Sequence, residues 1–185
     1  MSTIMYIHGY GSNGNAIKGQ SLRRMFPLHR VVSPTFDYDN RSPWEIQEQI
    51  RKTVASEEVK MIVGSSFGGY QTLCATAFFH GPVWAINPVH DVVNTIHRIF
   101  GNDISDVYFD FDSKVFRHQS KLNCNGEWPD DTPLNFALST DDELLGDHHP
   151  LLELFPKHQS VVWKDRCGHR FYRFEELRDD IAATL

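Results

Sequence analysis

Short apolar runs alternate with amphipathic stretches along most of the chain. The runs are rich in β-branched and aromatic residues and are bounded by Gly, Pro, Asn or Ser, as is typical of buried strands. They cover residues 3–8, 29–33, 59–64, 82–87, 134–139 and 160–164. The pattern therefore predicts six strands.

Helical patterns occupy most of the intervals between these runs. Ser42, Pro43 and Glu45 combine an N-cap, a proline at the first helical position and a capping box. Apolar side chains then recur at every fourth position from Ile46 to Val54, on one face of the predicted helix. Further helices are predicted at residues 16–26, 67–79 and 147–155, and a C-terminal helix carries Phe174, Leu177 and Ile181 on one stripe.

Strands that alternate with helices indicate a mostly parallel sheet with right-handed crossovers and helices on both faces. The strands are almost continuously apolar, which fits a sheet covered on both sides. We therefore expect a three-layer α/β/α sandwich around a mostly parallel six-stranded sheet. A chain of 185 residues fits one domain, spanning residues 1–185.

The interval 88–132 interrupts this alternation. It mixes aromatic and charged residues and shows no strand pattern. A loop of that length inside a compact domain is usually functional or disordered, so we expect a lid-like or cap-like insertion. Four of its aromatic residues, Phe109, Phe111, Phe116 and Trp128, could form an apolar acyl site or the insertion's own small core. The sequence leaves both possibilities open.

Composition narrows the class of protein. The apolar fraction of 41% and the charged fraction of 23% are typical of a soluble globular protein, and the longest apolar runs are too short to span a membrane. A net charge of −6 argues against a nucleic-acid partner. Three cysteines without a close pair form neither a disulfide framework nor a zinc spacing, and the first residues lack a secretory pattern. We expect a cytoplasmic protein without a metal or other cofactor.

The most informative segment is Gly64-Ser65-Ser66-Phe67-Gly68. It matches the G-x-S-x-G nucleophile elbow and lies between a predicted strand and a predicted helix, as that motif requires. The turn is so tight that the positions two before and two after the nucleophile must carry almost no side chain. Glycines flank Ser66 in this way, whereas Val63 and Phe67 flank Ser65. Ser66 is therefore the candidate nucleophile.

A glycine-rich turn between a strand and a helix could instead bind phosphate at the helix N-terminus. A phosphate-binding loop of the P-loop type ends in Gly-Lys-Ser or Gly-Lys-Thr, and this segment contains no lysine. The nucleophile elbow is the better interpretation.

A serine nucleophile needs donors that stabilise the oxyanion and a base that accepts its proton. The backbone N–H of Phe67 and that of Tyr10, in the loop His8-Gly9-Tyr10 after the first strand, are the candidate donors. We expect His8 itself to brace this loop rather than to act as a base. His169 lies after the last strand and before the last helix, which is the position of the base.

The acid that orients the base should follow the preceding strand. Asp141 and Asp142 lie there, which gives the order serine, acid, histidine of the α/β-hydrolases. Both aspartates remain candidates on position alone. The nearby Asp147-His148-His149 stretch is interpreted as a solvated helix start rather than as a metal site, and Asn87 is expected to line the edge of the site.

Four segments carry a resemblance to a known family: IMYIHGYGSN, MIVGSSFGGYQ, VWAINPV and DDEL followed by CGHRF. With them the chain resembles the α/β-hydrolase superfamily, and most closely the small bacterial esterases of the YqiA/YcfP type. The resemblance implies a minimal fold that begins at the first parallel strand. It also implies Asp142 as the acid, with Asp141 as the fallback, and short-chain acyl esters or thioesters as substrates.

These residues predict a serine hydrolase that cleaves small-molecule carboxylic esters or thioesters through an acyl-enzyme on Ser66. Gly9, Gly64 and Gly68 would support the site. An amide, a lactone or a C–C bond is an alternative substrate bond, because the elbow does not distinguish among them. A hydrolase-fold protein that binds a ligand or partner without turnover is a further alternative, although Ser66 and His169 are both present.

Overall fold

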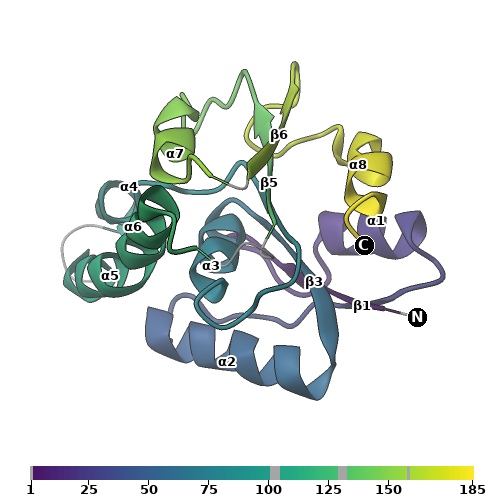
Figure 1. The fold of residues 1–185 in the computed structure, drawn as a ribbon, viewed down its shortest axis with the longest axis horizontal. Helices are drawn as coiled ribbons and strands as arrows, with labels where there is room; N and C mark the ends of the chain where they lie inside the picture. Colours follow the sequence, from purple (N-terminus) through teal and green to yellow (C-terminus); the bar gives the residue numbers. More distant parts are fainter. Residues whose placement is uncertain (1, 101–104, 129–132, 158) are drawn as a thin grey trace.

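Six parallel strands form one open sheet in a computed structural model that describes residues 2–100, 105–128, 133–157 and 159–185 (Figure 1). The strands are β1 (Thr3–Ile7), β2 (Arg30–Val32), β3 (Val59–Ser65), β4 (Val83–Ile86), β5 (Leu134–Ser139) and β6 (Gln159–Lys164). Their order across the sheet is β2-β1-β3-β4-β5-β6, and every neighbouring pair is parallel. The predicted parallel six-stranded sheet is confirmed, with strand ends displaced by at most one residue.

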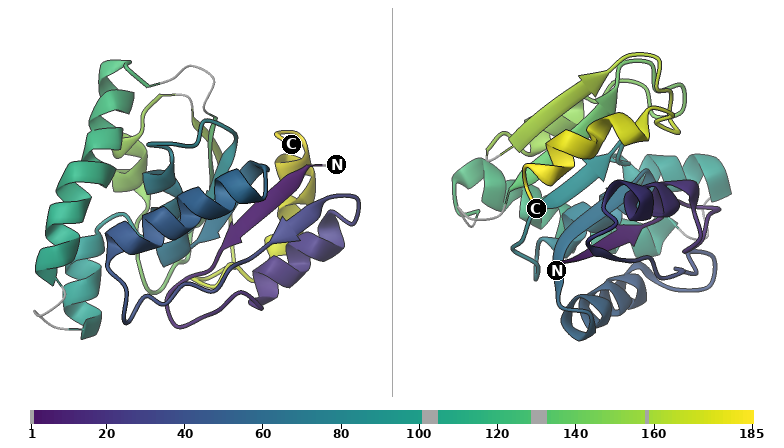
Figure 2. Two further views of the ribbon diagram at one scale, coloured as in Figure 1. Left: turned by 90° about the horizontal axis from the view of Figure 1, so that it is seen from below. Right: turned by 90° about the vertical axis from the view of Figure 1, so that its right-hand side faces the viewer.

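Helices cover both faces of this sheet (Figure 2). One face is covered by α1 (Ile17–Met25), the 3-10 turn η2 (Phe174–Leu177) and α8 (Arg178–Ala182). The other is covered by α2 (Pro43–Ser56), α3 (Phe67–Ala75), α4 (Val92–Phe100), α5 (Ser105–Phe111), the π-helical turn η1 (Asp112–Phe116), α6 (Arg117–Asn125) and α7 (His149–Leu154). The predicted three-layer arrangement is therefore confirmed.

Strand β1 shows why the sheet needs cover on both sides. Ile4 and Tyr6 belong to the core beneath α1 and α8, whereas Met5 and Ile7 belong to the core beneath α2 and α3. Successive side chains of a strand point to opposite faces, so an entirely apolar strand buries one set on each side. All four side chains are buried, as the continuous apolar run predicts.

Helix α2 begins where the capping pattern predicts. The Glu45 N–H donates to Ser42 Oγ at 3.3 Å, and the Ser42 N–H donates to a carboxylate oxygen of Glu45 at 2.9 Å. This reciprocal pair satisfies two backbone donors that have no partner inside the helix. Ile46 and Ile50 face the core from the next turns. The predicted capping box is confirmed.

The segment 88–132 is more ordered than its sequence pattern predicts. Its described part contains α4, followed by α5, η1 and α6, which run on from one another as one long helix (Figure 2). Residues 101–104 and 129–132 of the expected insertion lie outside the described residues. The described part contains no strand, as the sequence pattern indicates, but the expectation of a long loop is wrong because helices fill most of it.

The aromatic residues of this segment divide into two groups. Phe111, Phe116 and Trp128 are buried in the main core, where Phe116 and Trp128 contact the ring of Phe155. Phe109 is 65% exposed. Neither a separate small core nor an open acyl site describes the three buried rings, because they pack into the same core as α2 and α3.

A buried polar contact fixes the long helix against α3. The Tyr70 hydroxyl of α3 donates to Asp112 at 3.2 Å, and Arg117 Nε donates to the other carboxylate oxygen at 3.0 Å. Burial raises the pKa of Asp112, and these two donors oppose that rise. The π-helical turn lies at this contact. Its wider turn shifts the side-chain register, so the usual helical periodicity is lost there.

The remaining helices differ little from the expected ones. Helix α3 ends at Ala75 instead of residue 79, and the C-terminal stripe Phe174, Leu177 and Ile181 is buried across η2 and α8. Among the described residues, no helix combines the length and the apolar character that crossing a membrane requires.

Candidate active site

The candidate residues lie at the carboxyl edge of the sheet. Ser66 follows β3, Asp142 lies shortly after β5, and His169 lies in the loop after β6. Carboxyl ends of parallel strands meet at one edge, which is where open α/β sheets bind ligands. The topology thus brings together three residues that are far apart in the sequence.

The turn after β3 has the geometry of a nucleophile elbow. Ser66 has φ +56° and ψ −122°, a conformation that non-glycine residues rarely adopt. A Cβ at Gly64 would lie 2.2 Å from Thr72 Oγ1, and a Cβ at Gly68 would lie 2.2 Å from the carbonyl oxygen of Ile7. Neither flanking position has room for a side chain, so the chain reaches this turn only with glycine at both.

The two neighbouring serines have different surroundings. Ser65 is the last residue of β3, and its Oγ is 2.8 Å from the buried hydroxyl of Tyr6. Ser66 Oγ lies 2.8 Å from His169 Nε2. Only Ser66 contacts a possible base, which agrees with the choice made from the glycine spacing.

His169 continues the contact to Asp142. Its Nδ1 lies 3.1 Å from Oδ1 and 3.0 Å from Oδ2 of that carboxylate. Oδ1 also accepts the N–H groups of Leu144 (3.0 Å) and Leu145 (2.8 Å), and Oδ2 lies 3.1 Å from His148 Nε2. Burial would raise the pKa of Asp142, but the donors from His148, His169 and the Leu145 N–H hold it well below its usual value. Asp142 is therefore ionised at neutral pH.

Asp141 and Glu143, on either side of Asp142, accept hydrogen bonds from the backbone of residues 167–169. These residues belong to the loop after β6 that carries His169, here called the histidine loop. Asp141 Oδ1 accepts the N–H of Cys167 at 3.0 Å and that of Gly168 at 3.1 Å. A carboxylate oxygen of Glu143 accepts the N–H of His169 at 2.8 Å. Hydrogen bonds from the Ser139 hydroxyl and the Gly168 N–H lower the pKa of Asp141. Asp141 thus holds the loop, while Asp142 contacts the imidazole.

Asn87 connects the same loop to the end of β4. Its Nδ2 donates to the carbonyl oxygens of Gly168 (2.9 Å) and His169 (3.2 Å), and its Oδ1 accepts the Ser139 N–H at 2.7 Å. The residue is fully buried with φ +39°. The sequence predicts that Asn87 lines the edge of the site, and the structure adds that it joins the last residue of β5 to the loop after β6.

The loop after β1 lies against Ser66. A Cβ at Gly9 would lie 3.2 Å from the Cβ of Ser66 and from the Ser65 carbonyl oxygen, which is closer than side chains usually pack. Tyr10 follows directly, and its hydroxyl donates to Asp39. Phe67 is the first residue of α3, so its N–H has no acceptor within the helix. The two candidate oxyanion donors thus belong to segments that adjoin Ser66 from two sides.

His8 makes contacts on both ring nitrogens that do not involve Ser66. Nδ1 lies 2.8 Å from the Gly9 carbonyl oxygen, and Nε2 accepts the Phe36 N–H at 2.9 Å. The His8 carbonyl oxygen accepts the Tyr38 hydroxyl at 2.8 Å. Burial lowers the pKa of His8, which favours the neutral ring that these contacts require. Its contacts are those of a residue that braces the loop.

One interpretation from sequence is wrong for His148. Asp147 and His149 are exposed and contact each other at 2.6 Å, as expected of a solvated helix start. His148 between them is buried and contacts Asp142. Nothing in three adjacent polar residues distinguishes the one that turns inward, because that depends on how the loop after β5 runs.

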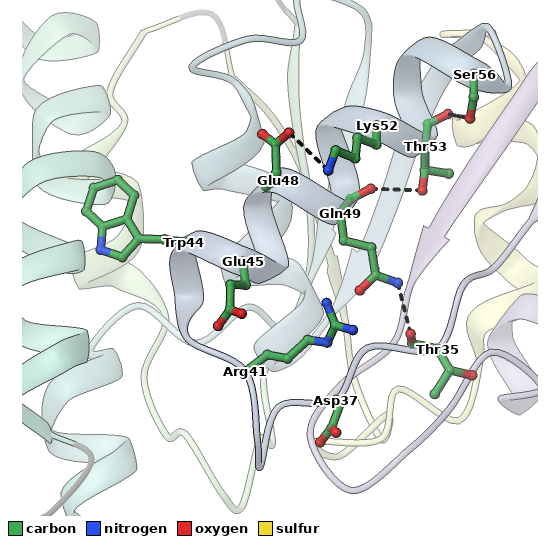
Figure 3. Close-up of a pocket in the computed structure, with 10 residues that line it drawn as sticks. All are labelled: Thr35, Asp37, Arg41, Trp44, Glu45, Glu48, Gln49, Lys52, Thr53 and Ser56. Atoms are coloured by element: carbon green, nitrogen blue, oxygen red, sulfur yellow. Dashed lines mark hydrogen bonds and ion pairs between the residues drawn. The ribbon is translucent and has the colours of Figure 1, made fainter.

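A separate groove of about 800 Å³ lies between the outer face of α2 and the loop at residues 35–41 (Figure 3). Gln49 donates to the Thr35 carbonyl oxygen across it at 3.1 Å, and Lys52 pairs with Glu48 along the helix. Its lining includes neither Ser66 nor His169. This groove is therefore distinct from the candidate active site.

Solved structures with the same fold come from several organisms. Est1E from Butyrivibrio proteoclasticus, in a structure with bound ferulic acid, has a TM-score of 0.74 at 10% identity over 100% of this chain and 89% of its own. The esterase domain of a Rhodothermus marinus protein has a TM-score of 0.69 at 15% identity, over 98% of this chain and 85% of its own. A Xanthomonas campestris α/β serine hydrolase without a lid has a TM-score of 0.65 at 16% identity, over 99% of this chain and 80% of its own. The chain has the α/β-hydrolase fold.

The particular family follows from the sequence as a whole. The chain belongs to the uncharacterised protein family UPF0227, whose pattern matches residues 3–185. No curated protein matches the chain in sequence.

Proposed function

We propose that the protein is a serine hydrolase that cleaves carboxylic esters or thioesters with Ser66, His169 and Asp142. Ser66 Oγ attacks the substrate carbonyl carbon while His169 Nε2 takes its proton. The tetrahedral intermediate collapses, and the leaving alcohol or thiol receives that proton. A water molecule, deprotonated by His169, then attacks the acyl-enzyme, and the acid product leaves as Ser66 regains its proton.

The observation that carries this proposal is the continuous contact from Ser66 Oγ through His169 to an ionised Asp142. With the imidazole proton on Nδ1, where Asp142 accepts it, Nε2 is left as an acceptor for the serine hydroxyl. The same carboxylate stabilises the imidazolium that forms during attack. A partly buried serine–histidine–aspartate contact at a strained turn has no evident structural purpose.

The oxyanion would be held by the N–H groups of Tyr10 and Phe67. Gly9 lies against Ser66, and Phe67 follows it, so both amides adjoin the serine. Backbone donors cost no reorganisation when the charge develops, and one such donor contributes roughly 10²–10³-fold to the rate. His8 would keep the Tyr10 amide in place through its contact with the Gly9 carbonyl oxygen.

The segment 88–132 would cover the acyl side of the site as part of a single domain. Two contacts support this. Arg98 of α4 donates to the carbonyl oxygen of Leu144, two residues after Asp142, at 3.2 Å. The ring of Tyr108 in α5 contacts the ring of Phe67, with 5.6 Å between their centroids. The substrate is expected to be a small molecule in the cytoplasm, with no metal or other cofactor required.

A second candidate function keeps the same residues but changes the bond, to an amide, a lactone or a C–C bond. A third is binding without turnover. The ionised Asp142 and the 2.8 Å contact between Ser66 and His169 favour turnover over binding, because a binding protein gains nothing from an activated nucleophile.

The test is hydrolysis of p-nitrophenyl esters from acetate to decanoate by the wild type, S66A and S65A. Ser65 is a matched control, because it is the neighbouring serine and contacts Tyr6 instead of His169. We expect activity in the wild type and S65A and none above background in S66A. Equal rates in all three proteins would show that the esterase assay reports another site and would overturn the proposal.

A further inference from the structure

His148 is a second histidine on the candidate catalytic acid. Its side chain is completely buried, and its Nε2 lies 3.1 Å from Asp142 Oδ2. The same oxygen lies 3.0 Å from His169 Nδ1. One carboxylate oxygen therefore contacts two imidazoles, of which only that of His169 contacts Ser66.

The protonation of His148 follows from its partners. An ionised carboxylate only accepts hydrogen bonds, so the proton of His148 lies on Nε2. Its Nδ1 is buried and has no hydrogen-bond partner within the described ranges. A second proton there would be a buried donor without an acceptor, which is costly. The arrangement fits a neutral ring that donates once, to Asp142.

The surroundings of His148 give its ring no second hydrogen-bond partner among the described residues. The His90 ring, before α4, lies 5.8 Å away between centroids. The only carboxylate in contact with His148 among the described residues is Asp142, which already receives its Nε2–H.

The contacts of Asp142 show what His148 adds. The N–H groups of Leu144 and Leu145 fix Oδ1 alone. A carboxylate held at one oxygen still turns about its Cβ–Cγ bond, because that torsion is broad. A donor on the other oxygen fixes the plane. His148 is the donor on Oδ2 that takes no part in the proton transfer.

We infer that His148 is a positioning residue that fixes the plane of the Asp142 carboxylate and, through it, the orientation of the His169 ring toward Ser66. This inference rests on the proposed function for its kinetic consequence, whereas the orientation of His169 can be observed without turnover.

The kinetic test compares H148L, which removes the donor, with H148Q, whose amide can still reach Asp142. We expect kcat for a p-nitrophenyl ester to fall on the order of 10–100-fold in H148L, as for the loss of a hydrogen bond to a charged group. KM should change little, and H148Q should recover most of the loss. H149L is the matched control, because His149 contacts Asp147 instead of Asp142, and it should match the wild type.

A spectroscopic test reads the orientation of His169 directly. Hydrogen-bonded imidazole N–H protons give resolved proton NMR signals far downfield. The wild type should show such signals from His8 Nδ1–H, His148 Nε2–H and His169 Nδ1–H. H148Q should keep the His169 signal. We expect this signal to broaden or disappear in H148L, which has no donor. H148N replaces H148L if that variant does not fold, because asparagine is too short to reach Asp142.

The inference is overturned if folded H148L keeps the kcat of H149L and a sharp His169 signal. It is also overturned if folded H148Q loses as much activity as H148L, since the donor would then not be what matters. Failure of the proposed function looks different. Wild type without any esterase activity would contradict the proposed function, while the NMR signals would still decide whether His148 positions His169.

Discussion

The two halves of the candidate site are held in place by different kinds of contact. Ser66 is fixed by steric exclusion at the elbow. A Cβ added at Gly64 or at Gly68 would lie 2.2 Å from a neighbouring side-chain or backbone atom. His169 is fixed by polar contacts, because Asp141, Asp142 and Glu143 accept hydrogen bonds from three consecutive residues of its loop.

This difference separates local from long-range encoding. The glycines that define the elbow lie within two residues of Ser66, and what the turn requires of them is the absence of side chains, although Gly68 meets the backbone of the distant Ile7 and His8. The histidine loop depends on carboxylates about 25 residues earlier in the chain and on Asn87, about 80 residues earlier. We therefore expect larger side chains at the glycines to disrupt the elbow, whereas changes of charge or pH should weaken the contacts that hold the histidine loop.

The largest expected effect comes from the polar half. D142N keeps the shape of the side chain but removes the charge and offers a donor where an acceptor is needed. We expect kcat to fall about 10⁴-fold, as for the same change in a serine protease triad. The free energy of unfolding should also fall, because the ionised carboxylate accepts hydrogen bonds from Leu144, Leu145, His148 and His169. Ester hydrolysis and a urea unfolding curve measure both. A rate within tenfold of the wild type would mean that Asp142 does not orient the base.

The steric half is tested by G68A. The added methyl group would lie 2.2 Å from the Ile7 carbonyl oxygen and 2.5 Å from that of His8. We expect the free energy of unfolding to fall by about 3 kcal/mol, the upper end for an overpacked site. G126A is the control, because Gly126 has φ +76°, unlike Gly68 inside α3, but a Cβ there would meet only the flexible end of Lys157. It should cost about 1–2 kcal/mol. Equal losses in the two variants would contradict the steric account.

A smaller effect is expected from N87G. Glycine accepts the positive φ of this position, so the change removes only the side-chain hydrogen bonds to Gly168, His169 and Ser139. We expect kcat to fall on the order of 10-fold while the elbow stays intact. Labelling by a fluorophosphonate should slow by a similar factor. Unchanged kinetics would show that the acids hold the loop without help from Asn87.

The smallest effect concerns the pH dependence of stability. The pKa of Asp141 is lowered in the folded protein, so its ionised form stabilises the fold above its ordinary pKa. That contribution is lost as the pH falls below about 4. D141N cannot titrate, so its free energy of unfolding should fall less steeply than that of the wild type between pH 5 and pH 3. Parallel curves from urea unfolding would contradict this assignment.

The sequence predicts the steric half of the site better than the polar half. The glycine spacing distinguishes Ser66 from Ser65, because the constraint acts over a few residues. Position alone left Asp141 and Asp142 open, and only the resemblance favoured Asp142. The course of the loop after β6 decides which carboxylate meets the imidazole, and that course depends on contacts spread over the whole fold.

The fold shows the same division between local and distant information. The sheet and the capping box of α2 follow from short patterns. The helices between residues 92 and 125 were missed, because a π-helical turn interrupts their periodicity and their buried rings pack against distant partners such as Tyr70 and Phe155. His148 was missed for a related reason, since its neighbours in the sequence are solvated.

The central claim is that Ser66 is a nucleophile activated by His169. Its most direct test is the mass of the intact protein after treatment with a fluorophosphonate probe, which releases fluoride on bonding to an activated serine. The account predicts one added probe mass on the wild type, mapped to Ser66 by peptide analysis, and none on S66A. Folded wild type that remains unlabelled, or S66A that gains the same mass, would contradict it.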